Sequence, residues 1–165
     1  ISADLAQKAA QALFAEGWRT PQKMAATRWR ERVTVLNRSG YARYDESTSR
    51  YIGESTQLLL DAYNGDLRRL RTAASRDPAT ERRLVKQFKG IGDVGADIFF
   101  REVQIVWDEL YPFADRKALD AADKLGLGAD AQKLAGLVNR TDFPRLLTGL
   151  VRVSGKTAIP ALRGE

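Results

Sequence analysis

Three glycines stand at a spacing that proteins use to bind phosphate groups. The stretch Gly90–Gly95 reads Gly-Ile-Gly-Asp-Val-Gly. After a β-strand and before a helix, this spacing is a dinucleotide fingerprint, in which glycine lets the backbone approach a pyrophosphate. Between two helices, the same glycines form a turn whose amides can hold a nucleic-acid phosphate. The flanking residues decide between these two interpretations.

The residues before the glycines are typical of a helix. Apolar side chains stand at Leu84, Val85 and Phe88 among charged ones, which is a helical period and not the continuous apolar run of a buried parallel strand. Asp77 followed by proline indicates a helix N-cap with proline at the first helical position. The sequence therefore favours a helical hairpin over residues 77–107 and disfavours the dinucleotide fingerprint.

In such a hairpin, backbone N–H groups reach a phosphate only where no side chain obstructs them. Gly90 and Gly92 meet this condition, and the helix that follows adds the positive end of its dipole. Lys86 and Lys89 add charge nearby, whereas Asp93, expected as the cap of the second helix, would bring a carboxylate close. Contacts of this kind position DNA without reading its sequence. Glycines also occur in helix turns that bind nothing, so both possibilities remain open.

Composition restricts the chemistry that the chain can perform. Its 165 residues include 27 lysines and arginines against 21 aspartates and glutamates, and the net charge of +6 suits a polyanionic partner or a well-solvated surface. The absence of cysteine and histidine excludes disulfides, thiolate metal sites and the usual neutral-pH base. Any reaction must use carboxylates, lysine, hydroxyl groups or bound water.

Helical periods joined by short turns run along the whole chain, which predicts an all-α fold in one domain, residues 1–165, without a dividing linker. Thr20, Asp66 and Asp77 are the expected caps, and Gly40 is an expected left-handed helix end. A tail is expected at 156–165. The expected helices cover 4–16, a short segment from 21, 29–39, 45–63, 66–70, 78–88, 93–110, 116–125, 130–139 and 142–153.

The helix after the glycines is predicted to present two faces until Tyr111-Pro112 ends it. An apolar stripe contains Phe99, Val103, Val106 and Leu110, and a polar stripe contains Asp97, Arg101, Gln104 and Asp108. Arg101 is a candidate pocket residue on this polar stripe. It is equally a candidate ion-pair partner of Asp97, four residues earlier.

Three separated segments together resemble the endonuclease III-like DNA glycosylases of the helix-hairpin-helix superfamily. The first is the hairpin 88–98, and the second is Pro112-Phe113-Ala114-Asp115, followed by a helix that ends in Leu-Gly-Leu at 125–127. The third is Ser39-Gly40-Tyr41 before the long helix 45–63. Their order and spacing agree with the family over roughly residues 1–127. The resemblance implies a helical bundle of that type and a partner in double-stranded DNA.

The resemblance also implies roles for single residues. Asp115 falls where the family keeps the carboxylate that stabilises positive charge on the sugar as the N-glycosidic bond breaks; an aspartate before a helix is equally an ordinary N-cap. Tyr41 falls where the family wedges a residue into the base stack, and Arg43 would meet a phosphate. Packing against a neighbouring helix is the alternative role for this tyrosine. Val94 and Gly95 belong to the DNA-binding hairpin.

Several positions depart from the family pattern. Val94 replaces the lysine nucleophile of the bifunctional members, so AP-lyase cleavage is not expected. Lys117 stands where the family commonly has histidine. We expect a solvent-exposed lysine, and the alternative is a substitute amine in the pocket. The cysteines of an iron–sulfur cluster are absent, and an N-terminal part of the family fold is expected to be missing.

These observations predict a monofunctional DNA glycosylase, and the alternative is a non-catalytic DNA-binding module of the same fold. A domain that binds dinucleotides or proteins, with glycines serving only the turn, is a third hypothesis. No metal or other cofactor is expected, apart from a structural monovalent cation at the hairpin. No apolar run of membrane-spanning length is present, and the start of the sequence leads us to expect no leader. We therefore expect a cytoplasmic, nucleoid-associated monomer without a membrane partner.

Overall fold

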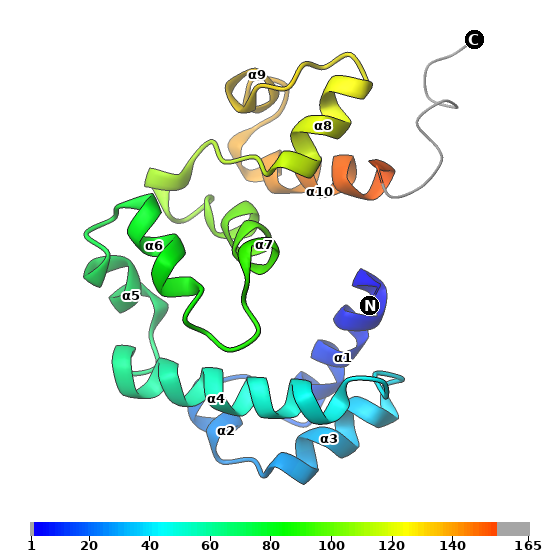
Figure 1. Cartoon of the computed structure of the whole chain (residues 1–165), viewed down its shortest axis with the longest axis vertical. Helices are drawn as coiled ribbons and strands as arrows, with labels where there is room; N and C mark the ends of the chain where they lie inside the picture. Colours follow the sequence, from blue (N-terminus) through cyan, green and yellow to red (C-terminus); the bar gives the residue numbers. More distant parts are fainter. Residues whose placement is uncertain (1, 155–165) are drawn as a thin grey trace. The chain divides into compact units, whose positions relative to one another are not determined.

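The computed structural model describes residues 2–154 of the chain, and these residues form helices joined by turns, without a strand among them (Figure 1). The all-α prediction is thus confirmed. By its contacts the chain divides into two compact units, Ile1–Ile91 and Gly92–Glu165, which are described separately. None of the helices formed by residues 2–154 is long and apolar enough to cross a bilayer.

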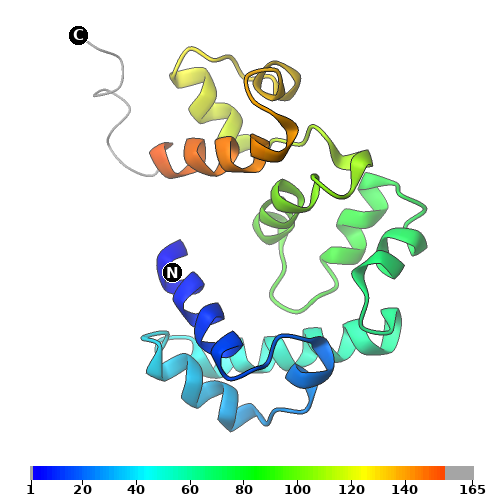
Figure 2. The ribbon, with the colours of Figure 1, turned by 180° about the vertical axis from the view of Figure 1, so that it is seen from behind.

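The first unit is organised around its longest helix. Helices α2 and α3 pack against α4, and α1 packs against α3, as both views of the ribbon show (Figures 1 and 2). Apolar residues of α1 and α3, including Leu13 and Leu36, form the core between these helices, and Ile52 of α4 packs against them. The helices are α1 (Ala3–Ala15), α2 (Pro21–Ala25), α3 (Trp29–Arg38), α4 (Asp45–Tyr63), α5 (Leu67–Ala73) and α6 (Pro78–Val85).

Helix ends in this unit follow the local sequence closely. The side chains of Thr20, Asp66 and Asp77 accept backbone N–H groups as N-caps of α2, α5 and α6, as predicted. The hydrogen bonds to Thr80 hold the pKa of Asp77 below its usual value. Gly40 follows α3 with a φ of 90° and confirms the expected left-handed helix end. Helix α6 ends at Val85, three residues earlier than predicted, because turn-type hydrogen bonds replace the helical ones from there to Phe88.

A buried arginine joins α3 to α4. Arg32 is only 6% exposed, and its guanidinium donates hydrogen bonds to the carbonyl oxygens of Ser49 (3.1 Å) and Thr27 (2.8 Å) and to both hydroxyl groups. Burial lowers the pKa of Arg32 from its ordinary value. A Cβ atom on Gly53 of α4 would lie 2.7 Å from a guanidinium nitrogen of Arg32. Glycine at this position therefore makes room for the arginine.

The second unit packs α8 against α10. Buried alanines at 118, 121 and 122 let α8 approach Phe143 and Leu147 of α10 closely, and Leu134 of α9 completes this core. Its elements are α7 (Asp93–Val103), the 3₁₀ turn η1 (Asp108–Leu110), α8 (Arg116–Lys124), α9 (Ala131–Ala135), the 3₁₀ turn η2 (Arg140–Asp142) and α10 (Phe143–Ser154).

Two predictions about this unit are wrong. Helix α7 ends at Val103 and not at 110, because the chain turns there and buries Trp107, whose ring meets Phe99 edge-on at 5.4 Å. Val106, which was expected on the apolar stripe, is consequently 60% exposed. Helix α9 ends before Gly136, so it is shorter than the predicted 130–139. The predicted tail, 156–165, lies outside the described residues.

Gly53→Ala is expected to destabilise the chain by about 1–3 kcal/mol, since the new methyl group displaces the buried Arg32 guanidinium. The matched control is Gly149→Ala in α10, where a Cβ meets nothing within 4 Å. This control should stabilise by up to about 1 kcal/mol, as alanine is the better helix former. Urea denaturation followed by circular dichroism measures both changes. Equal stability of the two variants would contradict the role given to Gly53.

Candidate nucleic-acid interface

The turn before Gly92 has a backbone that only glycine adopts easily. Gly90 has a φ of 85°, and a Cβ at this position would lie 2.9 Å from a ring carbon of Tyr51. The amide of Ile91 donates to the carbonyl of Phe88 (3.0 Å), and the Phe88 ring stacks on Tyr63 at 6.4 Å. Glycine at position 90 is therefore required for two reasons: the positive φ of the backbone and the close approach of the Tyr51 ring.

Gly92 differs from Gly90, because nothing in its surroundings requires a glycine. Its φ is −95°, and a Cβ would meet no atom within 4 Å. Gly92 is the N-cap of α7 and its carbonyl accepts the amide of Ala96 (2.9 Å). The expectation that Asp93 caps this helix is wrong, since Asp93 is its first helical residue. Val94 and Gly95 follow in the first turn, where amides have no intrahelical acceptor, and Val94 is 60% exposed.

A groove on the first unit brings several predicted residues together. We call it the tyrosine groove; Tyr41, Tyr44, Thr48, Tyr51, Lys89 and Gly90 are among its lining residues. The hydroxyl group of Ser55 donates to the carbonyl of Lys89 (3.3 Å) and so fastens the hairpin turn to α4. Lys86 and Lys89 are both exposed on this unit. The predicted residues Tyr41, Lys89 and Gly90 thus line one surface.

Tyr41 combines packing with a place in the groove. Its ring is partly buried against the core of α1 and α3, and its phenol oxygen accepts the hydroxyl group of Thr48 (3.3 Å). These contacts are those of the packing role that the sequence left open beside the wedge. Arg43, two residues on, is exposed, and its guanidinium lies 5.2 Å from the centre of the Tyr44 ring.

The second unit holds Asp115 in a buried ion pair. Arg101 Nε and Nη2 donate to Asp115 Oδ2 at 2.9 and 2.6 Å, and Asp115 Oδ1 accepts the amide of Ala118 (3.3 Å). Asp115 is 5% exposed and Arg101 is 7% exposed. Asp115 therefore caps α8, as one of its two predicted roles requires. Arg101 pairs with this carboxylate, fourteen residues further along the chain, a partner that the sequence did not indicate.

Gln104 is the residue of this site that the sequence reasoning missed. It is fully buried; its Oε1 accepts the amide of Phe113 (2.9 Å), and its Nε2 donates to the carbonyls of Phe113 (3.1 Å) and Arg101 (2.9 Å). Its backbone carbonyl accepts Arg140 (3.2 Å), whose guanidinium lies over the Tyr111 ring. The only signal in the sequence was its place beside Arg101 on the polar stripe of α7. Of the stripe that was expected to form a separate polar face, Arg101 and Gln104 are buried, whereas Asp108 is exposed.

The predicted site residues fall into two groups, one in each unit. Lys117 lies exposed on α8, two residues after the buried Asp115. Among the described residues, no cluster of three or more acidic side chains is arranged to hold a metal ion. The first unit carries Tyr41, Arg43, Lys86, Lys89 and Gly90, and the second carries Gly92, Val94, Gly95, Arg101, Asp115 and Lys117.

Comparison of the chain with protein-family models, with curated proteins and with solved structures gave no match. Its function has to be inferred from the geometry of these two groups.

Arg101→Met is expected to lower the free energy of unfolding by about 3–5 kcal/mol, because it leaves the Asp115 carboxylate buried without its counter-ion. The double variant Arg101→Met, Asp115→Leu should regain most of this loss, since no buried charge remains. Arg116→Ala is the control: this exposed arginine only approaches Asp120 at 3.8 Å, so the change should stay within about 0.5 kcal/mol. Guanidinium chloride denaturation provides the values. If Arg101→Met were as stable as Arg116→Ala, the ion pair would make no contribution to the stability of the fold.

Proposed function

We propose that this chain binds duplex DNA through the hairpin turn of Gly90 and Gly92. Gly90 has a left-handed backbone conformation, and a Cβ on Gly92 would meet no atom within 4 Å. These two glycines lead directly into the N-terminus of the eleven-residue helix α7, and this observation carries the proposal. In this geometry the first amides of α7 point away from the helix, where a phosphate can accept them. The dipole of α7 favours the same negative charge.

Charge near the turn supports a phosphate ligand. Lys86 and Lys89 are exposed residues within a few positions of Gly90, and the whole chain carries +6. Backbone amides and lysines recognise phosphates without contacting base edges, so the binding should be independent of sequence. Each phosphate neutralised releases counterions, which makes affinity fall steeply with salt.

Gly92→Ala is expected to weaken duplex binding about tenfold or more, because the methyl group stands between the phosphate and the amides that would bind it. The substitution should leave the fold intact, since a Cβ on Gly92 meets nothing and its φ suits alanine. Fluorescence anisotropy with a labelled duplex, at two or more salt concentrations, measures the affinity and its salt dependence.

Two further variants complete this test. Gly90→Ala should destabilise the chain by about 1–3 kcal/mol as well as weaken binding, because a left-handed alanine is strained and its Cβ meets Tyr51. Gly128→Ala lies outside the hairpin and should leave DNA binding unchanged. If Gly92→Ala binds as the unaltered chain does, the turn is not the DNA-binding element.

Base excision by Asp115 is a second candidate function. The observation in its favour is that Arg101 and the Ala118 amide hold this carboxylate in one orientation at the start of α8, the position that the family resemblance marks for catalysis. A fixed carboxylate can stabilise positive charge on a sugar. With both oxygens engaged and the side chain 5% exposed, however, the sugar could be reached only after the ion pair opens. Binding without excision therefore ranks first.

A panel of duplexes carrying oxidised, alkylated, deaminated or mismatched bases distinguishes the two candidates. If excision occurs, abasic sites will accumulate, and Asp115→Asn should slow their formation about 100-fold or more while Lys117→Ala leaves it unchanged. Borohydride should trap no covalent adduct, because Val94 offers no amine. Circular dichroism of Asp115→Asn checks that the fold survives. No excision of any lesion, or excision that persists in Asp115→Asn, would eliminate the second candidate.

A further inference from the structure

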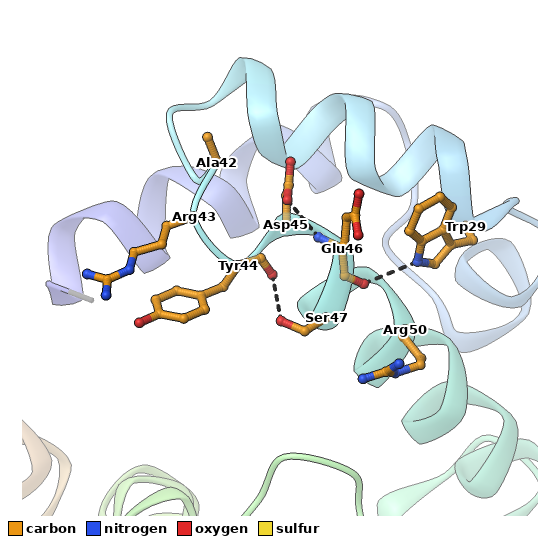
Figure 3. Close-up of a pocket in the computed structure, with 8 residues that line it drawn as sticks. All are labelled: Trp29, Ala42, Arg43, Tyr44, Asp45, Glu46, Ser47 and Arg50. Atoms are coloured by element: carbon orange, nitrogen blue, oxygen red, sulfur yellow. Dashed lines mark hydrogen bonds between the residues drawn. The ribbon is translucent and has the colours of Figure 1, made fainter.

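A second hollow continues the tyrosine groove beyond the hairpin. We call it the arginine pocket; it is lined by Trp29, Arg43, Tyr44, Ser47 and Arg50, together with Asp45 and Glu46 (Figure 3). The two hollows share Tyr44 and Ser47. From the N-cap residue Tyr44, positions 48, 51 and 55 follow at helical spacing on one face of α4, and all four residues line the groove. One continuous surface thus runs along α4 from Gly90 to Trp29.

Aromatic rings are presented along this surface in held positions. The indole N–H of Trp29 donates to the carbonyl of Glu46 (3.1 Å), which leaves the ring 40% exposed. Tyr44 is 42% exposed, and Tyr51 lies against Gly90 of the hairpin turn. Several large aromatic side chains that are exposed to solvent on one surface are typical of a binding site.

Positive charge accompanies the rings. Guanidinium carbons lie 5.2 Å from the centre of the Tyr44 ring, for Arg43, and 5.6 Å from the centre of the Tyr51 ring, for Arg50. In Figure 3 these two arginines and Tyr44 lie along one edge of the loop and of α4.

The neighbouring carboxylates do not cancel this charge. Asp45 is buried, and its two oxygens accept the Asn37 amide group (2.9 Å) and the backbone N–H of Glu46 (2.8 Å). The Glu46 side chain points away from the edge that carries the arginines (Figure 3). Glu54 approaches Arg50 only at 3.9 Å in an exposed pair, which is weak in water. Lys89 adds a cation at the other end of the groove.

We infer that this surface binds an unpaired stretch of a nucleic-acid strand. Bases stack on Tyr44 and Tyr51, and the adjoining phosphates pair with Arg43 and Arg50. Alternating rings and guanidinium groups suit this ligand, because unpaired bases expose the faces that a duplex hides. The inference rests in part on the proposed duplex binding: a duplex held at Gly90, which lines the groove, would place a neighbouring unpaired segment at the end of the groove formed by Tyr51.

The test compares three DNA ligands of equal length by fluorescence anisotropy: a duplex, the same duplex with a central bubble of unpaired thymidines, and the single strand. The unaltered chain is expected to bind the bubble about tenfold more tightly than the duplex. Tyr44→Ala should abolish this preference and weaken single-strand binding about tenfold, whereas Tyr44→Phe, which keeps the ring, should retain both. Arg43→Ala should weaken single-strand binding and lower its salt dependence.

Matched controls lie elsewhere on the first unit. Phe14→Ala removes another exposed aromatic ring, on α1, and Arg30→Ala removes an exposed arginine on α3; neither residue lines the groove or the pocket. Both variants should bind all three ligands as the unaltered chain does. Thermal unfolding of Tyr44→Ala shows whether its fold is intact.

The outcomes separate this inference from the proposed function. Equal binding of duplex and bubble, or single-strand binding that Tyr44→Ala and Arg43→Ala leave unchanged, overturns the inference even if Gly92→Ala weakens duplex binding. Loss of stability in Tyr44→Ala without loss of single-strand binding also overturns it, since the ring then serves packing alone. If the chain binds no duplex but binds single strands through Tyr44, the inference holds and the proposed function fails.

Discussion

The buried ion pair of Arg101 and Asp115 is the interaction on which the organisation of the second unit depends. Removing two charges from water is costly, and only close geometry with further hydrogen bonds offsets that cost. Both conditions are met: Arg101 donates twice to one carboxylate oxygen, and the Ala118 amide binds the other. The pair connects α7 to the start of α8, across a loop whose backbone Gln104 holds at Phe113.

This interaction also determines the order of the two candidate functions. A carboxylate fixed by arginine is held in one orientation, which excision requires, but it is closed to a sugar while the pair persists. Opening the pair would separate two charges in a poorly solvated interior. The free energy that this requires would have to be supplied by DNA binding. The hairpin needs no such rearrangement, because Gly92 is open already.

In the first unit the corresponding role belongs to α4. Arg32 ties α3 to one side of this helix through carbonyl and hydroxyl oxygens, and Gly53 leaves the space that its guanidinium occupies. Another face of the same helix carries Tyr51, follows on from the N-cap residue Tyr44 and meets the hairpin turn at Gly90. One helix therefore supports the core, the turn proposed to hold a phosphate and the surface proposed to hold unpaired bases.

Local sequence was sufficient to predict the all-α class, the bounds of α4 and the caps at Thr20, Asp66 and Asp77, because hydrogen bonds between residues two to four positions apart decide these features. It also predicted the capping role of Asp115 and the left-handed conformation at Gly40. The early end of α7, the burial of Arg101 and Gln104, and the cavity shared by Tyr41, Lys89 and Gly90 were beyond it. Each of these depends on partners eight to fifty residues away along the chain, and only tertiary packing decides which distant groups a side chain will meet.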